Sequence, residues 1–173
     1  MHFSFYICYM KTLLLIRHAK SSWANIGETD FDRSLNDSGK REAAEMAEKL
    51  VNQSIKINAF VSSPAKRARK TCKAFLDAYG KTKEEMILFE KLYHPASLIF
   101  YDVIKELNDN DNSVAIFSHN PGITEFVSTV CGKVRIVDMP TCGVFAVEAD
   151  IDSWKDFEKA EKSFLFFKYP KEQ

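Results

Sequence analysis

The sequence contains no apolar run near the roughly 20 residues that a membrane-spanning helix needs, which argues against a transmembrane protein. Its four cysteines lie far apart, without the CxxC pairs or the alternation with histidines that zinc sites use. The charges balance at 24 Lys and Arg against 24 Asp and Glu, so no net field favours nucleic acid or an anionic membrane. We therefore expect a cytoplasmic protein with reduced thiols, without nucleic-acid or membrane partners, whose cationic sites are local.

The chain of 173 residues is long enough to bury one substantial core and has the size of one ordinary α/β domain. Its first nine residues, MHFSFYICY, lack the basic region and the small-residue cleavage site of a signal peptide. Met10 then directly precedes a strand-like run. We expect a single domain over residues 10–173, with residues 1–9 as an N-terminal extension that need not be native and has no role in the site.

Apolar runs and helix-start signals alternate along the chain. The predicted strands span residues 11–17, 59–61, 86–89, 113–118, 143–149 and 163–169. The predicted helices span residues 37–52, 64–78, 96–107 and 123–131. Asn36 is the expected N-cap of the first helix, and Ser63 followed by Pro64 is the expected start of the second. This alternation predicts an α/β fold, a three-layer α/β/α sandwich with a mostly parallel central sheet and a hairpin-like pair of strands at one edge.

Charged side chains follow three of the predicted parallel strands. Arg17 and His18 come after the first strand, Arg67 lies in the first turn after the second, and His119 comes after the strand at 113–118. Because the carboxyl ends of parallel strands meet at one edge of a sheet, we expect these side chains to converge. Two guanidiniums beside two imidazoles suit a compact multivalent anion, above all phosphate.

Each of these residues also has an ordinary structural explanation. Arg17 or Arg67 alone would pair with a surface carboxylate, and a lone histidine at a strand end would be a hydrogen-bonded loop residue. A metal site built from His18, His94 and His119 is a further alternative, but two neighbouring arginines would oppose a divalent cation. We therefore expect neither a metal nor a cofactor.

Three segments of the chain resemble signature motifs of the histidine phosphatase (phosphoglycerate mutase-like) superfamily. They are RHAKSSW at residues 17–23, SSPAKRARKT at 62–71 and SHNPG at 118–122. Further segments are similar to the small SixA-like phosphohistidine phosphatase branch, namely DFDRSLNDSGKREA at 30–43, LYHPAS at 92–97 and TCGV at 141–144. The chain departs from the RHG motif of the broad family at Ala19 and Lys20, which changes the rim that faces the substrate.

The resemblance implies a phosphoglycerate mutase-like fold and a metal-independent phosphatase. His18 would be the nucleophile that forms a phosphohistidine intermediate. Arg17, Arg67 and His119, the last as an imidazolium, would hold the phosphoryl oxygens and stabilise the transition state. Where many family members carry a glutamate this chain has His94, which is the candidate general acid; the alternative is a loop histidine that lines the rim.

Two further polar residues are expected at the phosphate or substrate rim, Ser21 and Asn120, although Ser21 can equally cap a turn. Asp30 and Asp32 are interpreted mainly as solvated charges in the loop after the first strand. The DFDR spacing also suggests an ion pair that fixes this loop beside the pocket.

The expected function is a phosphohistidine phosphatase whose partner is a phosphohistidine-containing protein domain. A small-metabolite phosphomonoesterase of the same superfamily is the first alternative, and a non-catalytic module that binds phosphate or a phosphoprotein is the second. A mutase is least favoured. Only about 45 residues separate the second and third motifs, which leaves little room for the lid that would keep water from a retained phosphoryl group.

Overall fold

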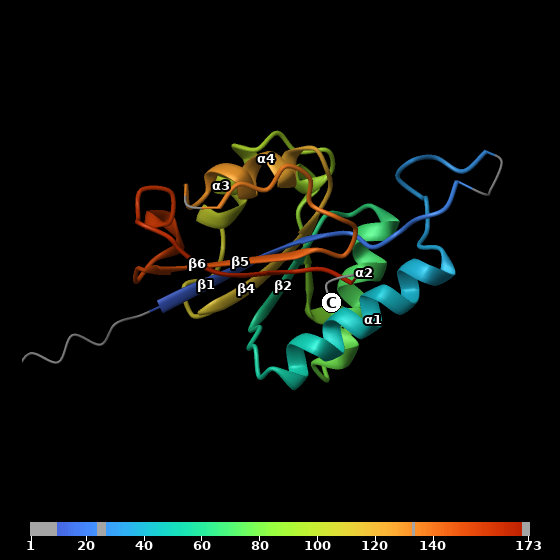
Figure 1. Ribbon diagram of the computed structural model, residues 1–173, viewed down its shortest axis with the longest axis horizontal. Coiled ribbons are helices and arrows are strands. Elements are labelled where there is room, and N and C mark those ends of the chain that lie inside the picture. The colour runs from blue at the N-terminus through green and yellow to red at the C-terminus, as the bar shows by residue number, and fades with distance from the viewer. Residues whose placement is uncertain (1–9, 24–26, 133, 171–173) are drawn as a thin grey trace, which may run out of the picture.

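The computed structural model describes residues 10–23, 27–132 and 134–170, and the predicted extension at residues 1–9 lies outside them (Figure 1). The strands are β1 (Met10–Arg17), β2 (Ala59–Ser62), β3 (Met86–Leu88), β4 (Ser113–Ser118), β5 (Val144–Asp150) and β6 (Ser163–Lys168). The α-helices are α1 (Asp37–Asn52), α2 (Lys66–Ala78), α3 (Ile99–Lys105) and α4 (Gly122–Thr129). None of the helices in these ranges is long and apolar enough to cross a membrane.

The strands form one mixed sheet in the order β3-β2-β4-β1-β5-β6. The first four strands in that order run parallel, whereas β5 runs antiparallel to β1 and β6 antiparallel to β5. The predicted hairpin-like pair is therefore confirmed at the β1 side of the sheet. The central strands β1 and β4 read as unbroken apolar runs because both faces of the sheet are covered.

Helices cover the two faces of the sheet in pairs, with α1 and α2 on one side and α3 and α4 on the other (Figure 1). Side chains of β1 alternate between the two sides, as the pleat of a strand requires. Leu14 and Ile16 pack in the core beneath α1 and α2, whereas Leu13 and Leu15 pack in the core beneath α3 and α4. The predicted three-layer sandwich is confirmed.

The first long helix, α1, begins where the sequence places it. Asn36 accepts a hydrogen bond from the backbone N–H of Gly39 at 2.8 Å, so the expected N-cap is present. Ala44 and Val51, however, are exposed, although their spacing suggested the buried face. The buried face of α1 is narrower than the apolar spacing indicates. Ala44 and Val51 lie at the margins of this face, beside the residues that contact α2 and the sheet.

The prediction for α2 is wrong at its start. The helix begins at Lys66, two residues after the predicted position, and the Ser63 hydroxyl accepts only a long bond of 3.3 Å from the N–H of Ala65. That hydroxyl also lies 2.8 Å from Nε2 of His119. The serine therefore faces the strand ends, and its partner there explains why it does not act as a regular cap.

The helix α3 is shorter than the predicted 96–107. At both ends the backbone closes in i to i−3 bonds, from Phe100 to Ser97 at 3.3 Å and from Leu107 to Ile104 at 3.1 Å. Leu98 is 71% exposed, so the amphipathic pattern counts one apolar residue that does not enter the core. The helix α4 agrees with its predicted range within two residues at each end.

The register of β1 against β4 positions the ends of both strands. Arg17 lies opposite Ser118, and the backbone N–H of His18 donates to the carbonyl oxygen of Ser118 at 3.1 Å. The residues that follow each strand, His18 and His119, are therefore neighbours in space although a hundred positions separate them in the chain.

The helix α1 docks tightly on the segment after β1 through Gly39. A Cβ atom added at this glycine would lie 2.0 Å from the carbonyl oxygen of Lys20, the same oxygen that accepts from Asn36 N–H at 3.1 Å. We expect Gly39→Ala to lower the free energy of unfolding by about 1–3 kcal/mol, because backbone atoms must move apart. Urea unfolding checks this, with Glu45→Ala at an exposed position of α1 as the control. Equal stability of the two variants would contradict the tight docking.

Candidate active site

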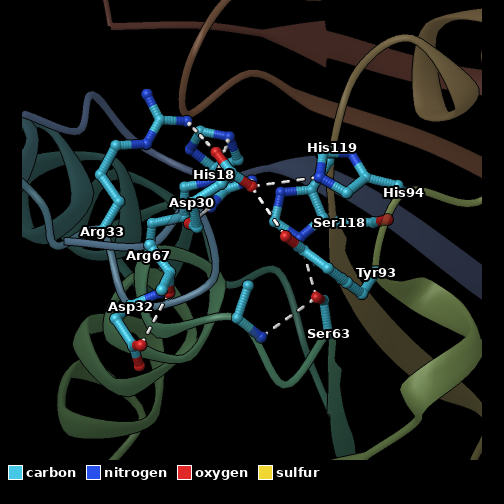
Figure 2. Close-up of polar contacts among 12 residues, drawn as sticks. His18, Asp30, Asp32, Arg33, Ser63, Arg67, Tyr93, His94, Ser118 and His119 are labelled. Atoms are coloured by element: carbon cyan, nitrogen blue, oxygen red, sulfur yellow. Dashed lines mark hydrogen bonds and ion pairs between the residues drawn. The ribbon is translucent and has the colours of Figure 1, made fainter. Parts of the chain in front are cut away.

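A cavity of about 360 Å³ opens at the carboxyl ends of the parallel strands. The sequence-predicted site residues all line it, namely Arg17, His18, Ser21, Arg67, His94, His119 and Asn120. The lining also includes Lys20, which the sequence placed at the substrate-facing rim, and residues that sequence reasoning did not assign to the site, namely Asp30, Arg33, Asn36 and Thr141. Figure 2 shows the polar contacts that connect His18, Asp30, Arg67 and His119 with their neighbours.

His18 comes directly after β1 and is only 7% exposed. Its Nδ1 lies 2.8 Å from the carbonyl oxygen of Ala19, and since a carbonyl only accepts, Nδ1 carries the proton. The lone pair is therefore on Nε2, which lies 3.2 Å from Nε of Arg67. Burial is the main cause that lowers the pKa of His18 to about 3; nearby guanidiniums add to it, and the Ala19 hydrogen bond opposes it. The ring is neutral at neutral pH.

His119 comes directly after β4, and its ring centroid lies 5.0 Å from that of His18. Its Nε2 is 2.8 Å from the hydroxyl oxygen of Ser63. Burial is the main cause that lowers the pKa of His119 to about 2; repulsion from the His18 ring when it is protonated and from the Arg67 guanidinium adds to it. These surroundings favour a neutral ring and not the imidazolium that the resemblance implied. A phosphate dianion beside the ring would supply the negative charge that stabilises the imidazolium.

Arg67 lies in the first turn of α2, and its side chain is almost fully buried. Its Nε contacts His18, while its two terminal nitrogens donate to the backbone oxygen and the carboxylate of Asp30. One guanidinium thus connects the His18 ring to the loop that follows β1. Arg17 is less deeply buried, and its Nη1 donates to the carbonyl oxygen of Met139 at 2.6 Å.

The cavity contains unsatisfied polar atoms. Among the described residues, Nε of Arg17, Nε of Arg33 and Nδ1 of His119 are buried without a hydrogen-bond partner, and all three residues line the cavity. Buried polar atoms are rarely left unpaired, so their accumulation here indicates a polar ligand. The described residues hold no group of three His, Cys, Asp or Glu side chains placed to bind a metal ion.

Asp30 is the centre of a network that the sequence interpretation missed (Figure 2). Its Oδ2 lies 3.0 Å from Arg67 Nη2, 2.9 Å from the Tyr93 hydroxyl and 3.1 Å from His94 Nε2, and its Oδ1 lies 3.2 Å from Arg33 Nη2. Burial alone would raise the pKa of Asp30, but the Tyr93 hydrogen bond and the charge of Arg67 outweigh it and lower the pKa to about 2. The interpretation of Asp30 as a solvated charge is therefore wrong.

The ion pair suggested by the DFDR spacing is present between Asp30 and Arg33, whereas Asp32 is exposed and accepts from the Thr29 hydroxyl at 2.7 Å. The guanidinium carbon of Arg33 lies 4.0 Å from the ring centroid of Trp23, whose side chain is 70% exposed. Arg33 is thus a further cation of the cavity, and the spacing of its motif was the signal available in the sequence.

The predicted rim residues are held in different ways. Ser21 forms an isolated antiparallel bridge with Leu35. The Asn120 amide nitrogen donates to Asp138 at 2.7 Å and its oxygen accepts from Thr124 at 2.7 Å, so its side chain stabilises the local chain as well as lining the cavity. His94 has a left-handed backbone, with φ at 48°, and its side chain is 52% exposed at the mouth.

The sheet with its cavity at the parallel-strand ends, the buried imidazoles and the surrounding guanidiniums are typical of a phosphatase. Residues 13–93, just under half of the chain, match the model of the histidine phosphatase superfamily (branch 1). The predicted resemblance and fold class are both confirmed.

Solved structures extend the similarity over almost the whole chain. The SixA structure from Agrobacterium tumefaciens is 25% identical, with a TM-score of 0.77, and the match covers 92% of this chain and 98% of that one. A structure of the protein histidine phosphatase SixA complexed with tungstate shares the fold at 20% identity and a TM-score of 0.77, covering 92% and 97%. A 2,3-bisphosphoglycerate-dependent phosphoglycerate mutase of Mesorhizobium japonicum is 35% identical over 89 aligned residues. These residues make up 48% of this chain and 43% of the mutase. The match to the mutase therefore spans less than half of its length.

The two buried histidines make stability depend on pH. In the unfolded chain each takes up a proton near its ordinary pKa of 6.5, but in the folded chain the pKa of His18 is about 3 and that of His119 about 2. The unfolded state binds more protons between these values, so lowering the pH below about 6.5 destabilises the fold, by up to about 1.4 kcal/mol per pH unit for each histidine.

Urea unfolding at about pH 7.5 and about pH 5 measures this dependence. His18→Gln removes one of the two groups, so this variant is expected to lose about half of the pH dependence. An unchanged dependence in the variant would show that the ring of His18 is protonated as readily in the folded chain as in the unfolded one.

Proposed function

We propose that this protein is a metal-independent phosphatase that forms a phosphohistidine intermediate on His18 and acts on phosphohistidine in a partner protein domain. The observation that carries the proposal is the state of the His18 ring. Its Nδ1 proton is donated to the Ala19 carbonyl, so the lone pair is on Nε2, where it accepts a hydrogen bond from Nε–H of Arg67. A bound phosphoryl group would draw this N–H to its own oxygens and free the lone pair. A neutral imidazole of this kind is ready to attack phosphorus without prior loss of a proton.

In the first step, Nε2 of His18 attacks phosphorus in line, and the bond from phosphorus to the leaving group breaks with its electron pair. Positive charge develops on the ring, and the Ala19 carbonyl that accepts from Nδ1 stabilises it. Arg17 and Arg67 hold the phosphoryl oxygens, and their fixed charges stabilise the negative charge that spreads over these oxygens in the transition state.

In the second step, water attacks the phosphorus of the intermediate and the nitrogen–phosphorus bond breaks. The electron pair returns to Nε2 of His18, and the oxygen of the water leaves with both of its protons as part of the released phosphate. His119, next to both His18 and Arg67, becomes the imidazolium when the dianion is bound and holds a further phosphoryl oxygen. Ser21 and Asn120 border the phosphate at the rim.

Phosphohistidine is the substrate class that this set of residues fits best. Asp30 is a carboxylate at neutral pH and therefore a poor proton donor. The imidazole of phosphohistidine can leave with the proton that its other nitrogen already carries, so it needs no strong acid. The likeness to the SixA structure from Agrobacterium tumefaciens, at 25% identity over nearly the whole chain, supports the same class.

A small-metabolite phosphomonoesterase is the second candidate, and the position of His94 favours it. The ring lies at the mouth of the cavity, where an oxygen leaving group would need a proton. Its Nε2 is engaged with Asp30, which can only accept, so Nδ1 is the atom left to donate. This role requires the doubly protonated ring.

We further propose that residues 10–173 form one domain and that the protein works in the cytoplasm. One continuous sheet that begins at residue 10 supports the first statement. The free thiols of Cys72, Cys131 and Cys142 are consistent with the second, because reducing compartments keep cysteines unpaired.

Replacement of the proposed nucleophile tests the mechanism. We expect His18→Ala to lower kcat/KM by at least about 10³-fold and to abolish a phosphorylated protein that survives base but not acid. The assay compares a phosphohistidine protein domain, phosphoramidate and phosphate monoesters in the presence of a chelator. A non-catalytic binding module would instead show no turnover in the native chain and the same phosphate affinity in the variant.

The role of His94 is tested by the contrast between substrates. His94→Ala is expected to slow hydrolysis of an alkyl phosphate more than hydrolysis of phosphoramidate, because only the first needs a proton on its leaving group. Steady-state kcat/KM on both substrates gives the answer. Equal losses would rule out an acid role for this ring.

A further inference from the structure

Asp30 is unusual among the residues that line the cavity, because it is the only carboxylate in the described lining. A site built for phosphate alone gains nothing from this charge, since a carboxylate repels a dianion. Its side chain is nevertheless held by four neighbouring groups and remains 30% exposed to the cavity. A carboxylate that is held in place yet remains exposed to the cavity suggests that Asp30 does more than support phosphate binding.

The position of Asp30 relates it to the leaving group. One guanidinium, that of Arg67, contacts His18 through Nε and Asp30 through Nη2, so the carboxylate and the nucleophile lie on the two sides of a single side chain. His18 is buried at the bottom, whereas Asp30 and the half-exposed His94 lie toward the mouth. In-line attack from His18 directs the leaving group away from the nucleophile and hence toward the mouth.

The carboxylate also has an acceptor position to spare. Its Oδ2 is engaged by Arg67, Tyr93 and His94, whereas its Oδ1 pairs, among the residues that the structure describes, with Arg33 alone, at 3.2 Å. Two carboxylate oxygens offer about four acceptor positions, and the two on Oδ1 are therefore not both used. A donor on the leaving group can bind there without displacing the existing network.

We infer that Asp30 forms a subsite that selects substrates whose leaving group presents a nitrogen-bound proton, such as the imidazolium of phosphohistidine or the nitrogen of phosphoramidate. The inference rests on the proposed function and deepens it, since it names the residue that distinguishes nitrogen–phosphorus from oxygen–phosphorus bonds. Asp30 would accept a charge-assisted hydrogen bond from the leaving group, which fixes both its protonation and its orientation.

Transfer of the phosphoryl group from phosphohistidine to His18 needs no proton donor from the protein. As Nε2 of His18 bonds to phosphorus, the nitrogen–phosphorus bond of the substrate breaks and its electron pair stays on the leaving nitrogen. The imidazolium keeps the proton on its other nitrogen, the one bound to Asp30, and departs as neutral imidazole. An ester leaves as an oxyanion that has no proton for Asp30 and is repelled by it, so the same carboxylate favours one class and disfavours the other.

The surroundings keep the subsite anionic across the useful pH range. The hydrogen bond from Tyr93 and the charge of Arg67 lower the pKa of Asp30 to about 2 despite its partial burial. The charged and titratable groups that face it are Arg33, Arg67, Tyr93 and His94, from three separate segments of the chain. The negative charge is thus present wherever the imidazolium of the substrate exists.

The test removes the charge and keeps the shape. Asp30→Asn is compared with Asp32→Asn, which changes an exposed carboxylate two positions away on the same loop. The substrates are a phosphohistidine peptide and p-nitrophenyl phosphate, whose leaving group needs no acid. We expect Asp30→Asn to lower the ratio of kcat/KM for the peptide to kcat/KM for the ester by about tenfold or more, and Asp32→Asn to leave it unchanged.

Two results would overturn the inference. Equal losses on both substrates would mean that Asp30 only positions Arg67, and equal gains would mean that it merely blocks the phosphate position. Binding of inorganic phosphate, followed by calorimetry, reports the Arg67 clamp separately. If Asp30→Asn fails to fold, Asp30→Ser removes the same charge and gives the same comparison.

Failure of the inference is distinguishable from failure of the proposed function. If the native protein hydrolyses the ester through His18 but not the peptide, the phosphatase mechanism stands and both the phosphohistidine preference and the Asp30 subsite are wrong. If neither substrate is hydrolysed in a His18-dependent manner, the proposed function itself is wrong. A preference for the peptide that survives Asp30→Asn overturns the subsite alone.

Discussion

The hydrogen bond from Nδ1 of His18 to the Ala19 carbonyl is the constraint on which the rest of the site depends, because it decides which ring nitrogen holds the lone pair. The residue that provides this carbonyl is itself anchored. The Ala19 N–H donates to the Thr71 hydroxyl at 3.0 Å, and that hydroxyl donates to the Arg67 carbonyl oxygen at 2.8 Å. The helix α2 thus orients the proposed nucleophile, His18, and supplies the cation beside it, so the two cannot move independently.

The parallel pairing of β1 with β4 also places the second imidazole, that of His119, beside His18. Once Arg17 lies opposite Ser118, the next residue of each strand must enter the same space, and the two rings meet at 5.0 Å between centroids. Two imidazoles at this separation and depth resist a double positive charge. The arrangement therefore favours two neutral rings in the free protein, and under the proposed mechanism His119 takes up a proton when a phosphoryl dianion binds.

The sequence was sufficient for those features that depend on local pattern. Buried strands, the Asn36 cap and the convergence of Arg17, His18, Arg67 and His119 follow from apolar runs and their ends. The sequence was insufficient where a side chain is positioned by contacts with residues that are distant in the sequence. Ser63 turns to His119 instead of capping α2, and Asp30 gathers partners up to 64 positions away, which no spacing rule reveals. Helix ends closed by tight turns, as in α3, are equally hidden from periodicity.

The contact between Arg33 and Trp23 has a practical consequence. The chain has two tryptophans, of which Trp154 is fully buried among core residues and Trp23 is largely exposed beside the cavity. The guanidinium carbon of Arg33 lies 4.0 Å from the ring centroid of Trp23, and the same guanidinium pairs with Asp30. A ligand that pairs with the Arg33 guanidinium changes the electric field at the Trp23 indole. The site therefore contains its own fluorophore, whose emission reports occupancy without an added label.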